Sequence, residues 1–215
     1  MFLAAAARLP LPLLPIQILW VNLVTDGLPA MALGMDPPEP DVMSRPPRRP
    51  DEGVFSRGLG GKILGRGLLI GLGTLALFLW GLLGGAGALG PGPGPGGIAE
   101  GGQVLARART LAFAGLVMAQ LFHVFDCRSE RRTIWEVGLF TNPWLVAAAA
   151  TSFGMLLAAV YWPPLAGVMG TFPLSFRDWL GVLAVAGAGQ GLVALQRLLL
   201  GGRAGAPWGR PVPGR

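Results

Sequence analysis

Cysteine, histidine and charged side chains are scarce in this chain of 215 residues. Charged residues make up 13% of it, whereas a typical soluble domain carries about 25%. The single cysteine, Cys127, excludes a disulfide framework within the chain. The single histidine, His123, excludes a metal site built from several histidines.

Hydrophobic residues are abundant instead, at 52% of the chain, together with 35 glycines and 20 prolines. So much glycine and proline could indicate a disordered linker, but disorder requires low hydrophobicity. Small residues in membrane helices let neighbouring helices approach closely. The net charge of +6 would suggest nucleic acid on a soluble protein. Here the basic residues lie between long apolar runs, which indicates membrane topology and no nucleic-acid partner.

Five apolar segments are long enough to cross a bilayer, which takes about 20 residues per helix. A short apolar stub, 1–7, precedes them. The pattern predicts an all-α, polytopic transmembrane helix bundle with about five full spans plus a truncated N-terminal helix. We expect one membrane domain over 1–202, loops over 84–102 and 162–177, and a disordered cytoplasmic tail over 203–215. The expected spans are 11–34, 63–83, 104–125, 144–162 and 179–200.

Arginine and lysine are distributed unevenly over the connections. Most of them lie after the first span, between the third and fourth spans, and in the tail. The excess of basic residues marks the cytoplasmic side. We therefore expect a multi-pass protein of the cell membrane with a cytoplasmic C-terminus.

The first span contains one carboxylate, Asp26, well inside apolar sequence. A charge at that depth costs roughly 2.5–3.5 kcal/mol and usually faces a bundle interior or a water-filled pathway. Asn22 and Thr25 precede it at spacings of four residues and one residue. In a regular α-helix the three side chains project from one face.

Gly27 and Pro29 follow Asp26 directly. Proline removes a backbone donor and glycine tolerates unwinding, so this pair predicts a break in the helix. Freed carbonyls at that depth are tolerated only where they are buried or line a cavity. Carboxylate, amide, hydroxyl and carbonyl oxygens together suit a hard cation such as Ca²⁺. The alternative is an Asp–Asn pair that only bonds between helices.

Several stretches resemble the P-type cation-transporting ATPases, in the calcium-pump (type IIA) subfamily and in its bacterial members. The longest covers Leu11–Arg48 and is similar to the sixth membrane helix with the cytoplasmic loop that follows. Another stretch resembles the eighth helix, and weaker similarity continues into the connection between the ninth and tenth helices. These further stretches are 109–113, 120–130, 161–165 and 173–179.

The resemblance implies roles for four residues. Asn22 and Asp26 match the sixth-helix calcium ligands, and Thr25 matches a weaker position that lends oxygen to a second ion site. Gln120 stands where two-site pumps have an eighth-helix glutamate. Because an amide offers oxygen without charge, a single transported ion is expected. The alternative for Gln120 is a hydrogen bond between helices.

The loop after the first span resembles the segment that couples the phosphorylation domain to the membrane. Ser44 departs from the family's pattern there. A solvated, proline-rich connector is the alternative interpretation. The residues expected to act in coupling are Asp36, Glu39, Asp41, Arg45 and Arg48.

The family's chemical machinery is missing from this sequence. No Asp-Lys-Thr-Gly phosphorylation motif occurs, so we expect no ATP hydrolysis by this chain alone. ATP and Mg²⁺ would act only through an N-terminal half that holds the phosphorylation, nucleotide and actuator domains and the first to fifth helices. The stub 1–7 resembles the end of the fifth helix. The chain is then a fragment, a mis-started reading frame or one piece of a split pump.

The sequence therefore predicts the ion-binding membrane portion of an ATP-driven Ca²⁺ pump, embedded in a lipid bilayer. One alternative changes the ion to Mn²⁺ or a monovalent cation, because oxygen ligands alone do not separate Ca²⁺ from Mn²⁺. Another is a membrane remnant or scaffold that transports nothing.

Overall fold

The computed structural model describes residues 1–38, 43, 59–88, 97–128 and 138–200. All regular structure within these ranges is helical, which confirms the predicted all-α class. In the same ranges, four helices are long and apolar enough to cross a membrane. These candidate spans are Pro15–Leu33, Ile63–Gly84, Gly102–Asp126 and Pro143–Tyr161.

The helices follow one another in the order of the predicted spans. A further helix, α9, occupies the fifth predicted span, although it is not among the four found by length and composition in the described residues. The predicted tail lies outside the described residues. The elements are α1 (Phe2–Ala6), α2 (Pro15–Trp20), η1 (Val21–Asp26), α3 (Gly27–Leu33), α4 (Leu59–Ala88), α5 (Gly97–Asp126), η3 (Leu139–Thr141), α7 (Pro143–Tyr161), α8 (Pro163–Met169) and α9 (Phe176–Leu200).

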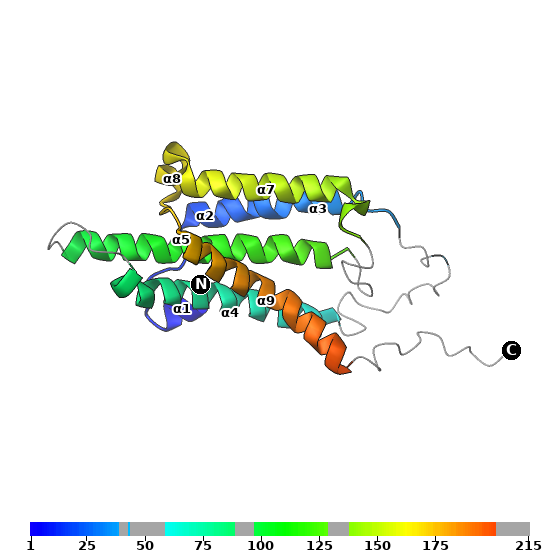
Figure 1. The fold of residues 1–215 in the computed structure, drawn as a ribbon, viewed down its shortest axis with the longest axis horizontal. Helices are drawn as coiled ribbons and strands as arrows, with labels where there is room; N and C mark the ends of the chain where they lie inside the picture. The colour runs from blue at the N-terminus through cyan, green and yellow to red at the C-terminus, as the bar shows by residue number, and fades with distance from the viewer. Residues whose placement is uncertain (39–42, 44–58, 89–96, 129–137, 201–215) are drawn as a thin grey trace.

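Helix α5 runs through the middle of an elongated bundle (Figure 1). Helix α7 lies alongside η1 and α3 on one side of it, while α4 and α9 pack on the other. Helix α9 crosses the bundle obliquely and contacts both α4 and α5. Because α5 is covered from both sides, it is the most buried of the four candidate spans.

The core follows from this central position. Helix α5 places Leu111, Phe113 and Val117 in it with no exposed surface. Helix α4 adds Phe78, and α9 adds Val182, both also fully buried. The outer helices keep many large apolar side chains exposed, as expected for surfaces that face lipid.

Two glycines let α4 and α5 approach closely. A Cβ atom added to Gly81 would lie 2.6 Å from the Cα atom of Ala108, and one added to Gly115 would lie 2.2 Å from a methyl carbon of Leu77. At Gly81 the close atom belongs to the backbone, so a larger residue has no room there, whereas at Gly115 the Leu77 side chain would have to shift. The expectation that small residues bring membrane helices together is met at this interface.

Two of the predicted loops include residues that are helical in the structure. Helix α4 continues to Ala88 and α5 begins at Gly97, so both ends of the expected loop 84–102 are helical. The expected loop 162–177 contains α8, which has prolines in its first turn and Gly170 after its end at φ 61. Proline is well suited to the first turn of a helix and glycine to its left-handed end. The prolines and Gly170 therefore mark the two ends of a short helix and do not indicate a loop.

Candidate functional site

The helix that carries the predicted ligands consists of three consecutive parts. The α-helical segments α2 and α3 flank the π-helical segment η1. The backbone stays right-handed at Gly27, with φ −65 and ψ −55. The expected unwound break at Gly27 and Pro29 is therefore corrected, since the interruption is a π-helical segment just before them. Pro29 has no amide hydrogen to donate, and the wider π-helical turn accommodates this loss without unwinding the helix.

The start of this helix is anchored by one buried amide. Gln17 has no exposed surface. Its Oε1 accepts a hydrogen bond from the Leu14 amide at 3.0 Å, and its Nε2 donates to the Met169 carbonyl at 3.1 Å. Both ends of the side-chain amide are thus satisfied. The contact holds the first turn of α2 against the end of α8.

Two of the predicted ligands meet, although 94 positions separate them in the sequence. The Nε2 atom of Gln120, on α5, donates to Oδ1 of Asp26, on η1, at 3.3 Å. Among the described residues, no arginine, lysine or histidine pairs with Asp26. Within the part of the chain that the structure describes, the carboxylate is therefore met by a neutral amide.

The remaining oxygens at this site are divided between two surroundings. Asn22 and Asp26 are exposed, whereas Thr25 is only 4% exposed. The three side chains therefore do not share one face, because the π-helical turn changes the angular spacing. Within the described part of the chain, Thr25 Oγ1 and Gln120 Oε1 are buried without a hydrogen-bond partner. Such atoms are uncommon in folded proteins, where a water molecule or an ion can satisfy them.

A serine that sequence reasoning missed contacts the same helix from the other side. Ser152 on α7 is buried, and its hydroxyl donates to the Val24 carbonyl at 3.0 Å. The pair of hydroxyl residues Thr151 and Ser152 within an apolar span was the available signal. Its partner could not be read from the sequence, because the two residues are 128 positions apart.

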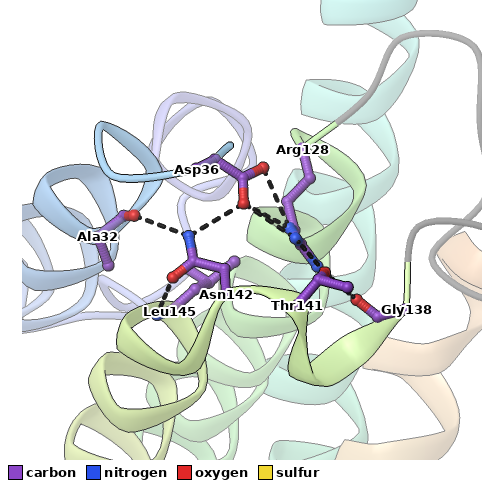
Figure 2. A network of polar contacts seen from close by, with 7 residues as sticks. All are labelled: Ala32, Asp36, Arg128, Gly138, Thr141, Asn142 and Leu145. Atoms are coloured by element: carbon purple, nitrogen blue, oxygen red, sulfur yellow. Dashed lines mark hydrogen bonds and ion pairs between the residues drawn. The ribbon is translucent and has the colours of Figure 1, made fainter. Parts of the chain in front are cut away.

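A further polar network surrounds Asp36, the first residue of the predicted coupling set (Figure 2). Arg128, at the end of α5, donates from Nε and Nη2 to the Asp36 carboxylate at 2.9–3.2 Å. Its Nη1 donates to the Gly138 carbonyl at 2.6 Å, and Nη2 also reaches the Thr141 hydroxyl at 2.7 Å. The Arg128 side chain is 1% exposed, while that of Asp36 is 16% exposed.

Asn142 extends this network to α3 and α7, as Figure 2 shows. Its Oδ1 accepts from the Leu145 amide at 3.0 Å and caps the N-terminus of α7. Its Nδ2 donates to the Ala32 carbonyl at 2.9 Å and to Asp36 at 3.0 Å. The other predicted coupling residues, Glu39, Asp41, Arg45 and Arg48, lie outside the described residues.

The far end of the bundle holds a buried ion pair. Arg107 on α5 pairs with Asp178 at the start of α9 through two hydrogen bonds. Ser175 adds its amide and its hydroxyl to the same carboxylate at 2.9 and 2.8 Å. The Arg107 and Asp178 side chains are 10% and 2% exposed. This pair ties two helices together and lies apart from the Asp26 site.

No cluster of three or more His, Cys, Asp or Glu side chains that could hold a metal occurs within the described ranges. The predicted ligands instead comprise one carboxylate, two amides and a hydroxyl, and the amide of Gln120 meets the carboxylate of Asp26. His123 lies in the last turn of α5 and Cys127 directly after its end, with Nε2 and Sγ 3.6 Å apart.

The family described as "Cation transporting ATPase, C-terminus" matches residues 10–199 of this chain. The chain belongs to this family. The resemblance inferred from the sequence is therefore confirmed, and the match covers every candidate span among the described residues. This ATPase C-terminal domain is similar to proteins whose names specify calcium transport.

Three relatives illustrate the similarity. The calcium-transporting ATPase of Bacillus subtilis is 46% identical over 202 residues, which cover 94% of this chain and 20% of the relative. Calcium-transporting ATPase 1 of Bacillus cereus is 41% identical over 85% of this chain and 20% of the relative. An endoplasmic reticulum-type calcium-transporting ATPase 4 of Arabidopsis thaliana is 32% identical over 86% of this chain and 21% of the relative. The domain thus spans about a fifth of the length of these relatives.

Proposed function

We propose that this ATPase C-terminal domain is the membrane-embedded, ion-binding portion of an ATP-driven Ca²⁺ pump. Asn22 and Asp26 act as ligands, and Thr25 and Gln120 contribute further oxygens. The observation that carries the proposal is the hydrogen bond from Gln120 to Asp26, together with two buried oxygens, Thr25 Oγ1 and Gln120 Oε1, that have no hydrogen-bond partner within the described residues. The names of the relatives, which specify calcium transport, support Ca²⁺ as the cargo.

The donor set suits a hard cation but does not complete its coordination. Ca²⁺ takes about 6–8 oxygen ligands, and this set offers one carboxylate, two amides and one hydroxyl. The exposed faces of Asn22 and Asp26 leave them open to ligands from another part of the pump. A chain that spans a fifth of its relatives is expected to share the site with the remaining four-fifths, including the fourth and fifth helices.

The Gln120 amide changes its role when a cation arrives. Without one, its NH₂ group donates to the Asp26 carboxylate and partly offsets the cost of a charge in an apolar span. A bound cation takes over that carboxylate, and rotation of the amide turns Oε1 toward the ion. An amide supplies oxygen but no second charge. One divalent ion per cycle is therefore favoured over two.

The network around Asp36 carries the coupling half of the proposal. Arg128 and Asn142 hold the start of the loop after α3 against the ends of α5 and α7. A force on the loop that begins at Asp36 is thereby transmitted to three helices at once. We propose that this end faces the cytoplasm, where the phosphorylation domain of the pump would act on it, and that the C-terminus lies on the same side.

The test uses a chimeric pump in which residues 10–199 replace the matching segment of the Bacillus subtilis calcium-transporting ATPase. Phosphorylation from ATP is measured against Ca²⁺ concentration for the parent chimera and for Asp26→Asn. The substitution removes one negative ligand while keeping the shape of the side chain. The Ca²⁺ concentration for half-maximal phosphorylation is expected to rise at least about 100-fold, since the number of charged ligands shifts Ca²⁺ affinity over orders of magnitude.

Thr151→Ala, at an exposed position on α7, is the control and should leave the Ca²⁺ response unchanged. A parallel titration with Mn²⁺ decides between the two ions. Unchanged Ca²⁺ dependence in Asp26→Asn would refute the site. A correctly inserted chimera that is never phosphorylated would favour the remnant or scaffold interpretation.

A further inference from the structure

One serine on α7 bonds to the backbone of the ligand-bearing helix. Ser152 is 1% exposed, and its hydroxyl donates to the Val24 carbonyl at 3.0 Å. Val24 lies inside the π-helical segment η1, midway between Asn22 and Asp26. The hydroxyl therefore contacts the backbone of the turn that presents both proposed ligands.

The Val24 carbonyl stands five residues before Pro29. In π-helical bonding a carbonyl pairs with the amide five residues further along. For Val24 that residue is Pro29, which has no amide hydrogen. A carbonyl left without a donor inside a bilayer is costly, because no water is present to replace it. The Ser152 hydroxyl offers the Val24 carbonyl a donor from the neighbouring helix.

Ser152 also behaves unlike two threonines on α4 and α5. Helical serines and threonines commonly bond to the carbonyl one turn back in their own helix. Thr74 on α4 and Thr110 on α5 do so, each at 2.8 Å. Ser152 instead donates across the helix interface to η1. Its hydroxyl is thus committed to the ligand-bearing helix.

We propose that Ser152 is a positioning residue for the cation site: its hydroxyl replaces the amide hydrogen missing at Pro29 and holds the π-helical turn that carries Asn22 and Asp26. This inference rests on the proposed function. Ser152 touches no ion in the proposal and acts only through the Val24 carbonyl. A serine that merely joined two helices would affect stability without depending on which residue occupies position 29.

A double-mutant cycle in the chimeric pump separates these two roles. The variants are Ser152→Ala, Pro29→Ala and the double substitution, with Thr151→Ala as the neighbouring control. The readout is the Ca²⁺ concentration for half-maximal phosphorylation. Ser152→Ala alone is expected to raise it about 5- to 10-fold, the ratio that follows from one lost hydrogen bond. Thr151→Ala should change it less than about twofold, as is usual for exposed positions away from a site.

The effect of Ser152→Ala should largely disappear when Pro29 is already alanine, because residue 29 then carries an amide that can bond to Val24. An equal fold-change in both backgrounds, or no change in Ser152→Ala, would overturn the inference. If Pro29→Ala does not yield folded protein, Ser152→Cys decides. Its thiol is a weak donor of similar size, so its Ca²⁺ requirement should fall between those of Ser152→Ala and the parent. A requirement equal to that of Ser152→Ala counts against the proposal.

Asp26→Asn, measured in parallel, distinguishes the two possible failures. If Asp26→Asn loses the Ca²⁺ response while Ser152→Ala keeps that of the parent, only the role of Ser152 is wrong. If Asp26→Asn keeps the response, the proposed function itself is wrong.

Discussion

The ion pair between Arg107 and Asp178 offers the sharpest test of how this bundle is held together. Its two side chains are 10% and 2% exposed, and Ser175 donates to the same carboxylate. Asp178→Ala removes the carboxylate and leaves the guanidinium of Arg107 buried between α5 and α9. The substitution also removes the acceptor for Ser175.

The expected loss is large because one charge remains without its partner. Removing one member of a buried pair typically costs about 3–5 kcal/mol. For a chain of this size, each kcal/mol corresponds to about 2–4 °C in the midpoint of thermal unfolding. Asp178→Ala should therefore lower that midpoint by about 6–20 °C. The midpoint is measured on the chain in lipid nanodiscs, from the heat-induced loss of the monodisperse peak in size-exclusion chromatography.

The matched control removes both charges at once, with Arg107→Met and Asp178→Leu combined. Replacing a buried pair by apolar residues of similar size is often neutral, so the double variant should unfold within a few degrees of the parent. The reasoning fails if Asp178→Ala unfolds at the parent temperature. It also fails if the double variant is as unstable as the single one, since loss of packing and not the unpaired charge would then explain the effect.

Two further predictions concern packing and the polar network. Gly81→Ala should lower the free energy of unfolding by about 1–3 kcal/mol, because its new methyl group would lie 2.6 Å from the Ala108 Cα atom. Gly154→Ala, at a position with open space, is the control and should not destabilise the chain. Equal thermal midpoints for the two variants would contradict the close approach of α4 and α5. Arg128→Gln should lower the free energy of unfolding by about 1.5–3 kcal/mol, since it breaks charged hydrogen bonds to Asp36. In the chimeric pump it should also slow turnover while leaving the Ca²⁺ requirement unchanged. A turnover rate equal to that of the parent would contradict the coupling role.

Helical class and the approximate position of each membrane helix could be predicted from the sequence alone. An apolar run of about 20 residues is a local property of the sequence. It forms a helix in a bilayer because the backbone groups can bond only to one another there. The predicted ends of helices were wrong where glycines could belong either to a loop or to a helix. Glycines near Gly84 and Gly97 were interpreted as a loop although both lie in helix, because glycine is more frequent in membrane helices than in soluble ones.

The candidate site was proposed from the chemistry of its residues, whereas its geometry could not be predicted from the sequence. Asp26 stands out because a carboxylate within an apolar span is expensive, and family resemblance pointed to Asn22 and Gln120. The form of the interruption was not predictable. Proline predicts that a hydrogen bond is lost, but it does not say whether the chain unwinds, kinks or widens into a π-helical turn.

The composition and the order of residues along the chain predicted a membrane protein built of helices. They also predicted residue types suited to a cation. Which distant groups meet depended on the packed bundle. Gln120 reaches Asp26 across 94 positions and Ser152 reaches Val24 across 128. Such pairs form when α5 and α7 pack against η1, and the depth and rotation of that packing depend on the shapes of all the helices together.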